Sequence, residues 1–182
     1  MSSVNEAGRR RFLRFAAGAA MSALAFPAEA ARRIIRPREL AFHNLHTGEA
    51  LKTVYWADGR YLPEAMRRIN WLLRDFRTDE VRPIDPRLLD LLADLHTRLR
   101  GQAPFQVISG YRSPETNAML ASLTDGVAQN SLHLEGKAID IRVPGRRLKQ
   151  VRAAAVSLRR GGVGYYPQSD FVHIDTGRVR YW

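Results

Sequence analysis

The sequence contains no cysteine among its 182 residues. A disulfide framework, lipid attachment through cysteine and a zinc site made of thiolates are therefore excluded, and a bound metal would have to use His, Asp or Glu. Long apolar runs are also missing, because the one extended run, at residues 15–26, is shorter than the roughly 20 residues of a membrane-spanning helix. Internal repeats and low-complexity segments are absent too. The length suits one ordinary globular domain.

Acidic residues are scarce. The chain has 18 of them against 29 lysines and arginines, which gives a formal net charge of +11. Such a charge favours polyanionic partners: nucleic acid, acidic phospholipid headgroups or the carboxylates of peptidoglycan stem peptides. Simple solubility without a specific partner explains the charge as well, so the charge alone selects no function.

The first thirty residues have the three-part layout of an export signal. Three consecutive arginines, 9–11, precede the apolar run 15–26, and Ala28-Glu29-Ala30 fits a small-x-small cleavage site. Paired arginines before a modestly hydrophobic segment resemble a twin-arginine signal, which implies the Tat translocase as a partner and a periplasmic location. The general export route and an uncleaved anchor stay open. Cleavage after Ala30 would lower the net charge from +11 to +9 and leave no stable membrane insertion.

We expect residues 31–39 to form a basic linker and residues 40–182 to form the functional domain. Apolar periodicity and turn residues predict strands at 40–45, 51–56, 105–109, 137–143, 163–166 and 171–175. Helices are expected from Pro63 to about Arg77, from Asp85 to Gly101, and at 115–123 and 148–158. Trp71 and the leucines of the first two helices are expected to lie in the core. This mixture indicates an α+β fold.

The segment from Ser131 to Asp140 has the strongest chemical signal. His133 precedes a glycine bend at Gly136, and Asp140 follows within a predicted strand whose alternate residues are apolar. The bend can return His133 toward Asp140, and an imidazole beside a carboxylate can bind zinc. His173 lies on the polar face of a second strand. A histidine within a strand is, however, more often hydrogen-bonded packing than a metal ligand, so spacing alone does not define a three-ligand site.

Several motifs together resemble a known family. They are Ser131-x-His133-x-x-Gly136-x-Ala138-x-Asp140, the segment Ser109-Gly110-Tyr111-Arg112-Ser113, and the segments 44–49 and 161–177. This set is similar to the zinc D-Ala-D-Ala metallopeptidases, which include VanX-type dipeptidases and share their site with lysostaphin-type enzymes and hedgehog domains. The MepK-type murein endopeptidases are the most similar group. The resemblance implies a small antiparallel sheet with helices on one side, and Zn²⁺ held by His133, Asp140 and His173.

The resemblance also implies roles for neighbouring residues. Arg112 would bind substrate and stabilise the oxyanion of the tetrahedral intermediate, which suits an always-charged guanidinium with paired donors. A salt bridge at a helix start is the alternative for Arg112. Tyr111 and Ser131 would contact substrate.

The general base is less well defined by the resemblance. Many relatives have a histidine where this chain has Phe171, whereas VanX-type enzymes have a glutamate at the position of Asp170. We therefore expect Asp170 to be the base. Asp175 would orient a ligand by hydrogen bonding. Three other residues are weaker candidates: His43 and His46 as structural histidines, and Glu135 facing solvent.

The leading functional prediction is a zinc-dependent endopeptidase that hydrolyses peptide cross-links of peptidoglycan, chiefly L,D (3-3) links between meso-diaminopimelate residues and secondarily D,D (4-3) links. A D,D-carboxypeptidase or dipeptidase acting on stem peptides is an alternative. A wall-binding module that keeps zinc for structure is another. Nucleic acid is disfavoured as a partner because an exported protein seldom meets it.

Overall fold

The computed structural model describes residues 36–123 and 128–182. The expected export signal at 1–30 and the start of the linker lie outside these ranges. Within them, no helix combines the length and apolarity that crossing a membrane requires. The expected linker is shorter than predicted at its far end, because the first strand already begins at Arg38.

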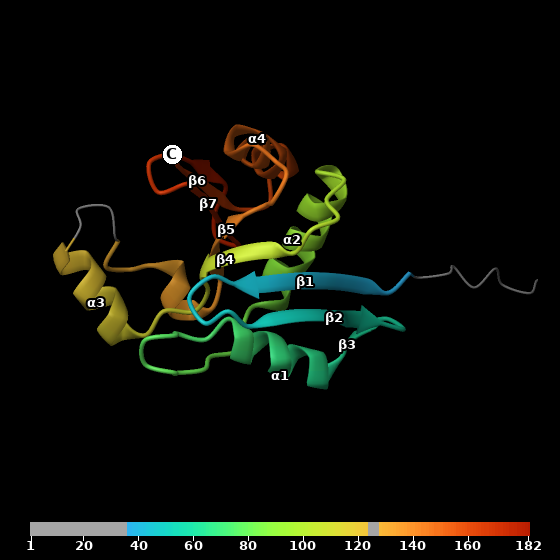
Figure 1. Cartoon of the computed structure of the whole chain (residues 1–182), viewed down its shortest axis with the longest axis horizontal. Coiled ribbons are helices and arrows are strands. Elements are labelled where there is room, and N and C mark those ends of the chain that lie inside the picture. Colours follow the sequence, from blue (N-terminus) through green and yellow to red (C-terminus); the bar gives the residue numbers. More distant parts are fainter. Residues whose placement is uncertain (1–35, 124–127) are drawn as a thin grey trace, which may run out of the picture. The chain divides into compact units, whose positions relative to one another are not determined.

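An eight-stranded sheet forms the centre of the fold, in the order β3-β2-β1-β4-β5-β7-β6-β8 (Figure 1). The strands are β1 (Arg38–Asn44), β2 (Ala50–Ala57), β3 (Arg60–Tyr61), β4 (Phe105–Ser109), β5 (Ala138–Arg142), β6 (Gly162–Tyr166), β7 (Phe171–Asp175) and β8 (Arg180–Tyr181). Most neighbours are antiparallel, but β1 runs parallel to β4 and β6 runs parallel to β8. The sheet is therefore mixed and larger than the small antiparallel sheet that the resemblance implies. Two of the strands, β3 and β8, have only two residues each, which is too short for a periodic signal.

Four α-helices and one 3₁₀-helix accompany the sheet. They are α1 (Pro63–Leu72), α2 (Pro86–Arg98), α3 (Pro114–Leu123), η1 (Leu132–Glu135) and α4 (Leu148–Leu158). Helix α1 packs against β2, α2 packs against β1 and α4, and α4 packs against β6 and β7. The mixture of helices and a mostly antiparallel sheet agrees with the expected α+β class. The detailed likeness to hedgehog domains stays a prediction.

Helix α1 is shorter than its apolar pattern indicates. It ends at Leu72, five residues before the predicted end, and the next carbonyl, of Leu73, accepts the amide of Tyr111 at 2.8 Å. Trp71 is 51% exposed rather than in the core. Its indole nitrogen donates to Glu49 at 3.2 Å, and the Arg74 guanidinium lies 4.1 Å from its ring centre. These polar neighbours explain why a large aromatic ring is stable at the surface.

The central strands separate apolar from polar side chains, as period-2 alternation predicts. Ile139 and Ile141 of β5, with Val172 and Ile174 of β7, enter the hydrophobic core that α2 and α4 complete. The residues between them face the other side of the sheet. This site face holds Asp140 and His173 of β5 and β7, and it also includes Gly164 and Tyr166 of β6 through the strand register.

Candidate active site

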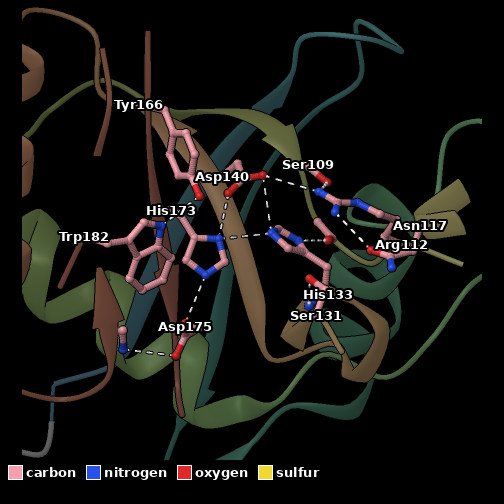
Figure 2. A network of polar contacts seen from close by, with 12 residues as sticks. Ser109, Arg112, Asn117, Ser131, His133, Asp140, Tyr166, His173, Asp175 and Trp182 are labelled. Carbon is pink, nitrogen blue, oxygen red and sulfur yellow. Dashed lines mark hydrogen bonds and ion pairs between the residues drawn. The ribbon is translucent and has the colours of Figure 1, made fainter. Parts of the chain in front are cut away.

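Three side chains from three elements meet on the site face. His133 Nε2 and His173 Nδ1 lie 3.2 Å apart. The two carboxylate oxygens of Asp140 lie 3.3 Å from the former and 2.9 Å from the latter. All three residues are buried, and Figure 2 shows them pointing toward one another. They form a group that could hold a metal ion.

Each histidine is oriented by a hydrogen bond from its other ring nitrogen. His133 Nδ1 lies 2.7 Å from the carbonyl oxygen of Gly110, which can only accept, so Nδ1 carries the hydrogen and Nε2 faces the group as an acceptor. His173 Nε2 donates to Asp175 Oδ2 at 3.0 Å, which directs Nδ1 toward Asp140. Fixed tautomers of this kind are typical of metal-ligating histidines.

Two different devices bring the three residues together. The antiparallel register of β5 and β7 places Asp140 directly opposite His173. His133 comes instead from η1, whose cap residue Gly136 adopts a left-handed φ of 66°. A Cβ atom at Gly136 would lie 2.4 Å from the carbonyl oxygen of Pro83, so both the conformation and the space require glycine. The sequence-based expectation of a bend returning His133 to Asp140 is confirmed.

Asp175 lies beneath the group with both carboxylate oxygens occupied. Oδ1 accepts the amides of Gly162 at 3.0 Å and Gly177 at 2.8 Å, while Oδ2 accepts from His173 and from Arg180 Nη2 at 2.8 Å. Its exposure is 0%. These donors hold the pKa of Asp175 well below its usual range, against the opposing effect of burial. Asp175 is thus a fixed anion that orients His173.

The group attracts positive charge. Burial alone would raise the pKa of Asp140, but the His133 and His173 rings hold that pKa well below its usual range. Burial would lower the pKa of His173, but its hydrogen bonds to Asp140 and Asp175 raise the pKa to about 9. Both shifts have the same cause, which is the close approach of buried carboxylates to the imidazole rings, and this concentration of negative charge would also favour a bound cation.

Arg112 lies beside the group and is itself buried. Its Nη2 is 3.7 Å from Asp140 Oδ2, and its Nη1 donates to Asn117 Oδ1 at 3.3 Å. Within the described part of the chain, Arg112 Nε has no hydrogen-bond partner. Burial lowers the pKa of Arg112, and the nearby Asp140 opposes that shift. The Arg112 amide donates to the carbonyl oxygen of His133 at 3.2 Å, which ties the arginine to the segment that carries His133.

A cavity of about 370 Å³ opens over these residues. His133, Asp140, His173 and Arg112 lie in its wall. Other lining residues are aromatic or small and polar, among them Tyr166, Phe171, Trp182, Ser131 and Ser169. The cavity therefore combines a potential metal site, a buried cation and an apolar wall.

Comparison with known protein families gives a match over residues 32–182 to the family described as peptidoglycan L,D-endopeptidase MepK. The match covers most of the chain. The chain belongs to this family.

Individual relatives agree with the family match. The peptidoglycan L,D-endopeptidase MepK of Escherichia coli (strain K12) is 46% identical over 97% of this chain and 98% of its own length. The protein of the same name from Shigella flexneri has the same identity and coverage. A probable peptidoglycan L,D-endopeptidase MepK from Haemophilus influenzae is 45% identical over 81% of this chain and 80% of its own length.

Two of the expected site residues of this MepK-family chain do not reach the cavity. Tyr111 is 2% exposed, and its hydroxyl donates to Glu80 at 2.6 Å, so it anchors its segment instead of facing substrate. Asp170 does not line the cavity although its neighbours Ser169 and Phe171 do. Its carboxylate is 65% exposed and lies 3.2 Å from Arg142 Nε. The turn carries Asp170 at a left-handed φ of 53°, which directs it to this ion pair.

The other expected residues lie where the patterns indicate. Ser131 lines the cavity and accepts the His133 amide at 3.4 Å. Glu135 is exposed and pairs with Lys137. Neither His43 nor His46 lines the cavity, and the His46 ring stacks on Phe76 at 4.0 Å.

Sequence reasoning missed several residues of this MepK-family site. Asn117 contacts Arg112, Arg180 pairs with Asp175, and Tyr166 and Trp182 line the cavity. One signal was available in the glycines of β6. A Cβ atom at Gly164 would lie 2.7 Å from the Trp182 ring, and one at Gly162 would lie 2.4 Å from Asp175 Oδ2. Alternate glycines in a strand can therefore mark a face on which large side chains cross the sheet.

Proposed function

We propose that this protein is a zinc-dependent peptidoglycan endopeptidase that hydrolyses L,D (3-3) cross-links between meso-diaminopimelate residues, with D,D (4-3) links as a second candidate bond. The observation that carries the proposal is the convergence of His133, Asp140 and His173 beside the buried Arg112 in a cavity wall. Membership of the MepK family supplies the substrate class.

The donor set supports zinc as the metal. Two imidazoles and one carboxylate are typical of catalytic zinc sites, which keep a fourth position open. Zinc–ligand bonds of about 2.0–2.2 Å at tetrahedral angles separate neighbouring ligand atoms by roughly 3.3–3.5 Å. The separations of 3.2 and 3.3 Å from His133 Nε2 are close to this range, and the 2.9 Å contact between His173 and Asp140 is slightly shorter.

The residues around the ligands provide the rest of the chemistry. When bound, zinc supplies Lewis acidity, which polarises the scissile carbonyl and activates water near neutral pH. Arg112 lines the cavity beside the ligand residues, so its guanidinium would donate to the oxyanion that develops on the substrate, and its burial would strengthen this interaction. Asp175 holds His173, and Gly110 holds His133, so the ligands need no reorganisation. Asp170 as general base stays a prediction, which would require its turn to move from Arg142.

The proposal includes an exported location. Peptidoglycan lies outside the cytoplasmic membrane, and the sequence of residues 1–30 supports export by the twin-arginine route to the periplasm. We therefore assign residues 1–30 to the signal and, because β1 begins at Arg38, residues 38–182 to the peptidase domain. The net positive charge suits a substrate that is rich in carboxylates.

Digestion of defined cross-linked dimers tests the proposal. Purified, zinc-loaded protein is incubated with 3-3 and 4-3 linked muropeptide dimers, and the products are resolved by mass spectrometry. Parallel reactions contain a chelator, the His133→Ala variant or the control variant His46→Ala, whose ring stacks on Phe76 outside the cavity. We expect monomers from the 3-3 dimer, loss of the reaction with chelator and His133→Ala, and little change with His46→Ala.

Two other outcomes would support the alternative functions. Release of a terminal residue from monomers with intact dimers would indicate a carboxypeptidase. Intact dimers and monomers with one bound zinc per chain would indicate a wall-binding module.

A further inference from the structure

We propose that the hydroxyl of Tyr166 is a further catalytic group, which donates a hydrogen bond to an oxygen of the tetrahedral intermediate from the side opposite Arg112. This inference rests on the proposed peptidase function and adds a residue to it. Trp182 would act as a positioning residue, because it touches Tyr166 and holds the hydroxyl in place.

The strand register places Tyr166 on the site face. Gly164 pairs with His173, and Tyr166, two residues further along β6, pairs with Phe171. The Tyr166 and Phe171 rings stack with centroids 4.5 Å apart and planes 19° apart. Both rings line the cavity. The stack fixes the plane of the tyrosine ring and therefore limits where its hydroxyl can lie.

The contact with Trp182 determines which hydrogen bond the Tyr166 hydroxyl can still form. The indole Nε1–H of Trp182 lies 2.8 Å from Tyr166 Oη, and indole nitrogen can only donate. The tyrosine oxygen is thus the acceptor in this contact, and its own hydrogen stays available for a second partner. A neutral O–H donor beside a developing oxyanion is the arrangement that electrostatic stabilisation requires.

The backbone anchors Trp182 on both sides. Its carbonyl oxygen accepts the amide of Tyr165 at 2.9 Å, and its amide donates to Val163 at 3.2 Å. Its ring centre lies 5.3 Å from that of His173. The ring occupies the space that a side chain at residue 164 would need, since a Cβ atom there would lie 2.7 Å from it. Two independent contacts, from Trp182 and from Phe171, therefore hold Tyr166.

Tyr166 and Arg112 lie on opposite sides of the three ligand residues. Figure 2 shows Arg112 on one side of the three ligand residues and the Tyr166–Trp182 pair on the other. A substrate carbonyl held over the ligands would lie between a cationic donor and a neutral donor.

A pair of adjacent tyrosines provides a matched test. Tyr166→Phe removes only the hydroxyl and keeps the ring that stacks on Phe171. Tyr165→Phe is the control, because Tyr165 pairs with Val172 and lies under Arg152 on the other face of β6. With the 3-3 dimer as substrate, we expect Tyr166→Phe to lower kcat by at least about 10-fold with KM changed by less than about twofold. Tyr165→Phe should leave both unchanged.

Trp182→Phe tests the positioning role. It removes the indole donor, so we expect a smaller fall in kcat with unchanged KM and an unchanged zinc dissociation constant. In the double variant with Tyr166→Phe, the tryptophan substitution should cause no further loss, because the hydroxyl through which it acts is gone. Independent, multiplicative losses would contradict the link between the two residues.

A second readout does not depend on turnover. A phosphinate dipeptide isostere mimics the tetrahedral centre, and its binding to zinc-loaded protein can be measured by calorimetry. We expect Tyr166→Phe to weaken this binding by about 10-fold, with Tyr165→Phe and the zinc affinity unchanged. If the wild type cleaves dimers but Tyr166→Phe matches Tyr165→Phe in both assays, the inference is wrong and the proposed function stands. If the wild type cleaves nothing, the proposed function fails, and equal phosphinate affinities would then reject the role of Tyr166 as well.

Discussion

The two sides of the cavity are built by different means. On the strand side, Asp140, His173 and Tyr166 occupy fixed positions in the ladder of β5, β7 and β6. On the loop side, Arg112 and His133 belong to segments outside the sheet. Hydrogen bonds to residues far away in the sequence hold these segments in place. Examples are the bond from the Ser113 amide to Asp75 at 2.8 Å and the bond from the Tyr111 amide to Leu73.

Because of this difference, we expect the two sides of the cavity to respond differently to substitution. Backbone ladders on both sides of a strand residue keep its position when one side chain changes. A loop residue depends on a few side-chain contacts, so the loss of one contact can move it. We therefore expect substitutions on the strand side to change chemistry or metal affinity at a retained geometry. Substitutions among the loop anchors should change stability and geometry together.

The largest expected effect is on kcat, when the Arg112 guanidinium on the loop side is replaced. Arg112→Lys keeps the charge but loses the paired donors, and we expect kcat to fall by about 100- to 1,000-fold with zinc content retained. Steady-state kinetics on the 3-3 dimer and metal analysis measure both quantities. Arg160→Lys is the control, because Arg160 does not line the cavity and pairs instead with Asp94 of α2. A fall below tenfold would mean that Arg112 serves structure more than catalysis.

Asp175→Asn tests the strand side, at the carboxylate that supports His173. The substitution weakens the acceptor that orients His173 and leaves Arg180 without its carboxylate partner. Loss of such a supporting carboxylate typically costs about 10- to 100-fold in metal affinity. Competition with a chromogenic chelator measures the zinc dissociation constant. Glu135→Gln, an exposed acid within the first motif, should leave that constant unchanged.

Asp75→Asn tests the anchoring of the loop side. Asp75 is 1% exposed and accepts the Ser113 amide at 2.8 Å and the Arg77 amide at 3.0 Å. Replacing one acceptor oxygen by an NH₂ group should lower the free energy of unfolding by about 1–3 kcal/mol at pH 7. Urea denaturation measures this loss, with the exposed Asp79→Asn as the control.

The same variant has an expected pH dependence. Burial alone would raise the pKa of Asp75, but the hydrogen bonds that it accepts lower it below the usual value. A depressed folded-state pKa stabilises the protein above the unfolded-state pKa of about 4, and this contribution disappears as the pH falls through the folded-state pKa. The difference between wild type and Asp75→Asn should therefore shrink as the pH is lowered from 5 toward about 2. A constant difference would show that ionisation of Asp75 is not the cause.

The smallest expected effect concerns Asp170. Its carboxylate is exposed and paired with Arg142, and such surface pairs contribute at most about 1 kcal/mol. If the turn keeps this position, Asp170→Asn should change kcat by less than about twofold. A loss of 100-fold or more would instead confirm Asp170 as the general base, because general acid–base catalysis typically contributes about 100- to 10,000-fold. The turn would then have to move Asp170 toward the ligands during the reaction.

The sequence predicted the three candidate metal ligands better than the residues around them. Alternation within β5 and β7 assigned Asp140 and His173 to the polar face, and Gly136 marked the bend that returns His133. Asp170 was expected at the site because VanX-type enzymes have a glutamate at its position, three residues before His173. Spacing along the chain does not define the direction of a side chain in a turn with positive φ.

Residues that depend on distant partners were the least predictable. Trp71 has the composition of a core residue, but Arg74 and Glu49 stabilise its ring and indole nitrogen at the surface. Tyr111 lies next to Arg112 in sequence, yet its ring is buried against a different segment with Glu80. Tyr166 and Trp182 became visible as a pair only through the strand register and the space above Gly164.

The sequence by itself indicated the α+β class through its periodicity, and its ordered motifs indicated the family, whose resemblance implied the three candidate ligands. Periodicity and ordered motifs can be read locally along the chain. The tertiary structure alone decided that β5 pairs with β7 so that Asp140 faces His173, that Asp170 turns to Arg142, and that Trp182 lies against Tyr166. These arrangements depend on strand register and long-range contacts, and a sequence pattern does not encode which distant residues will meet.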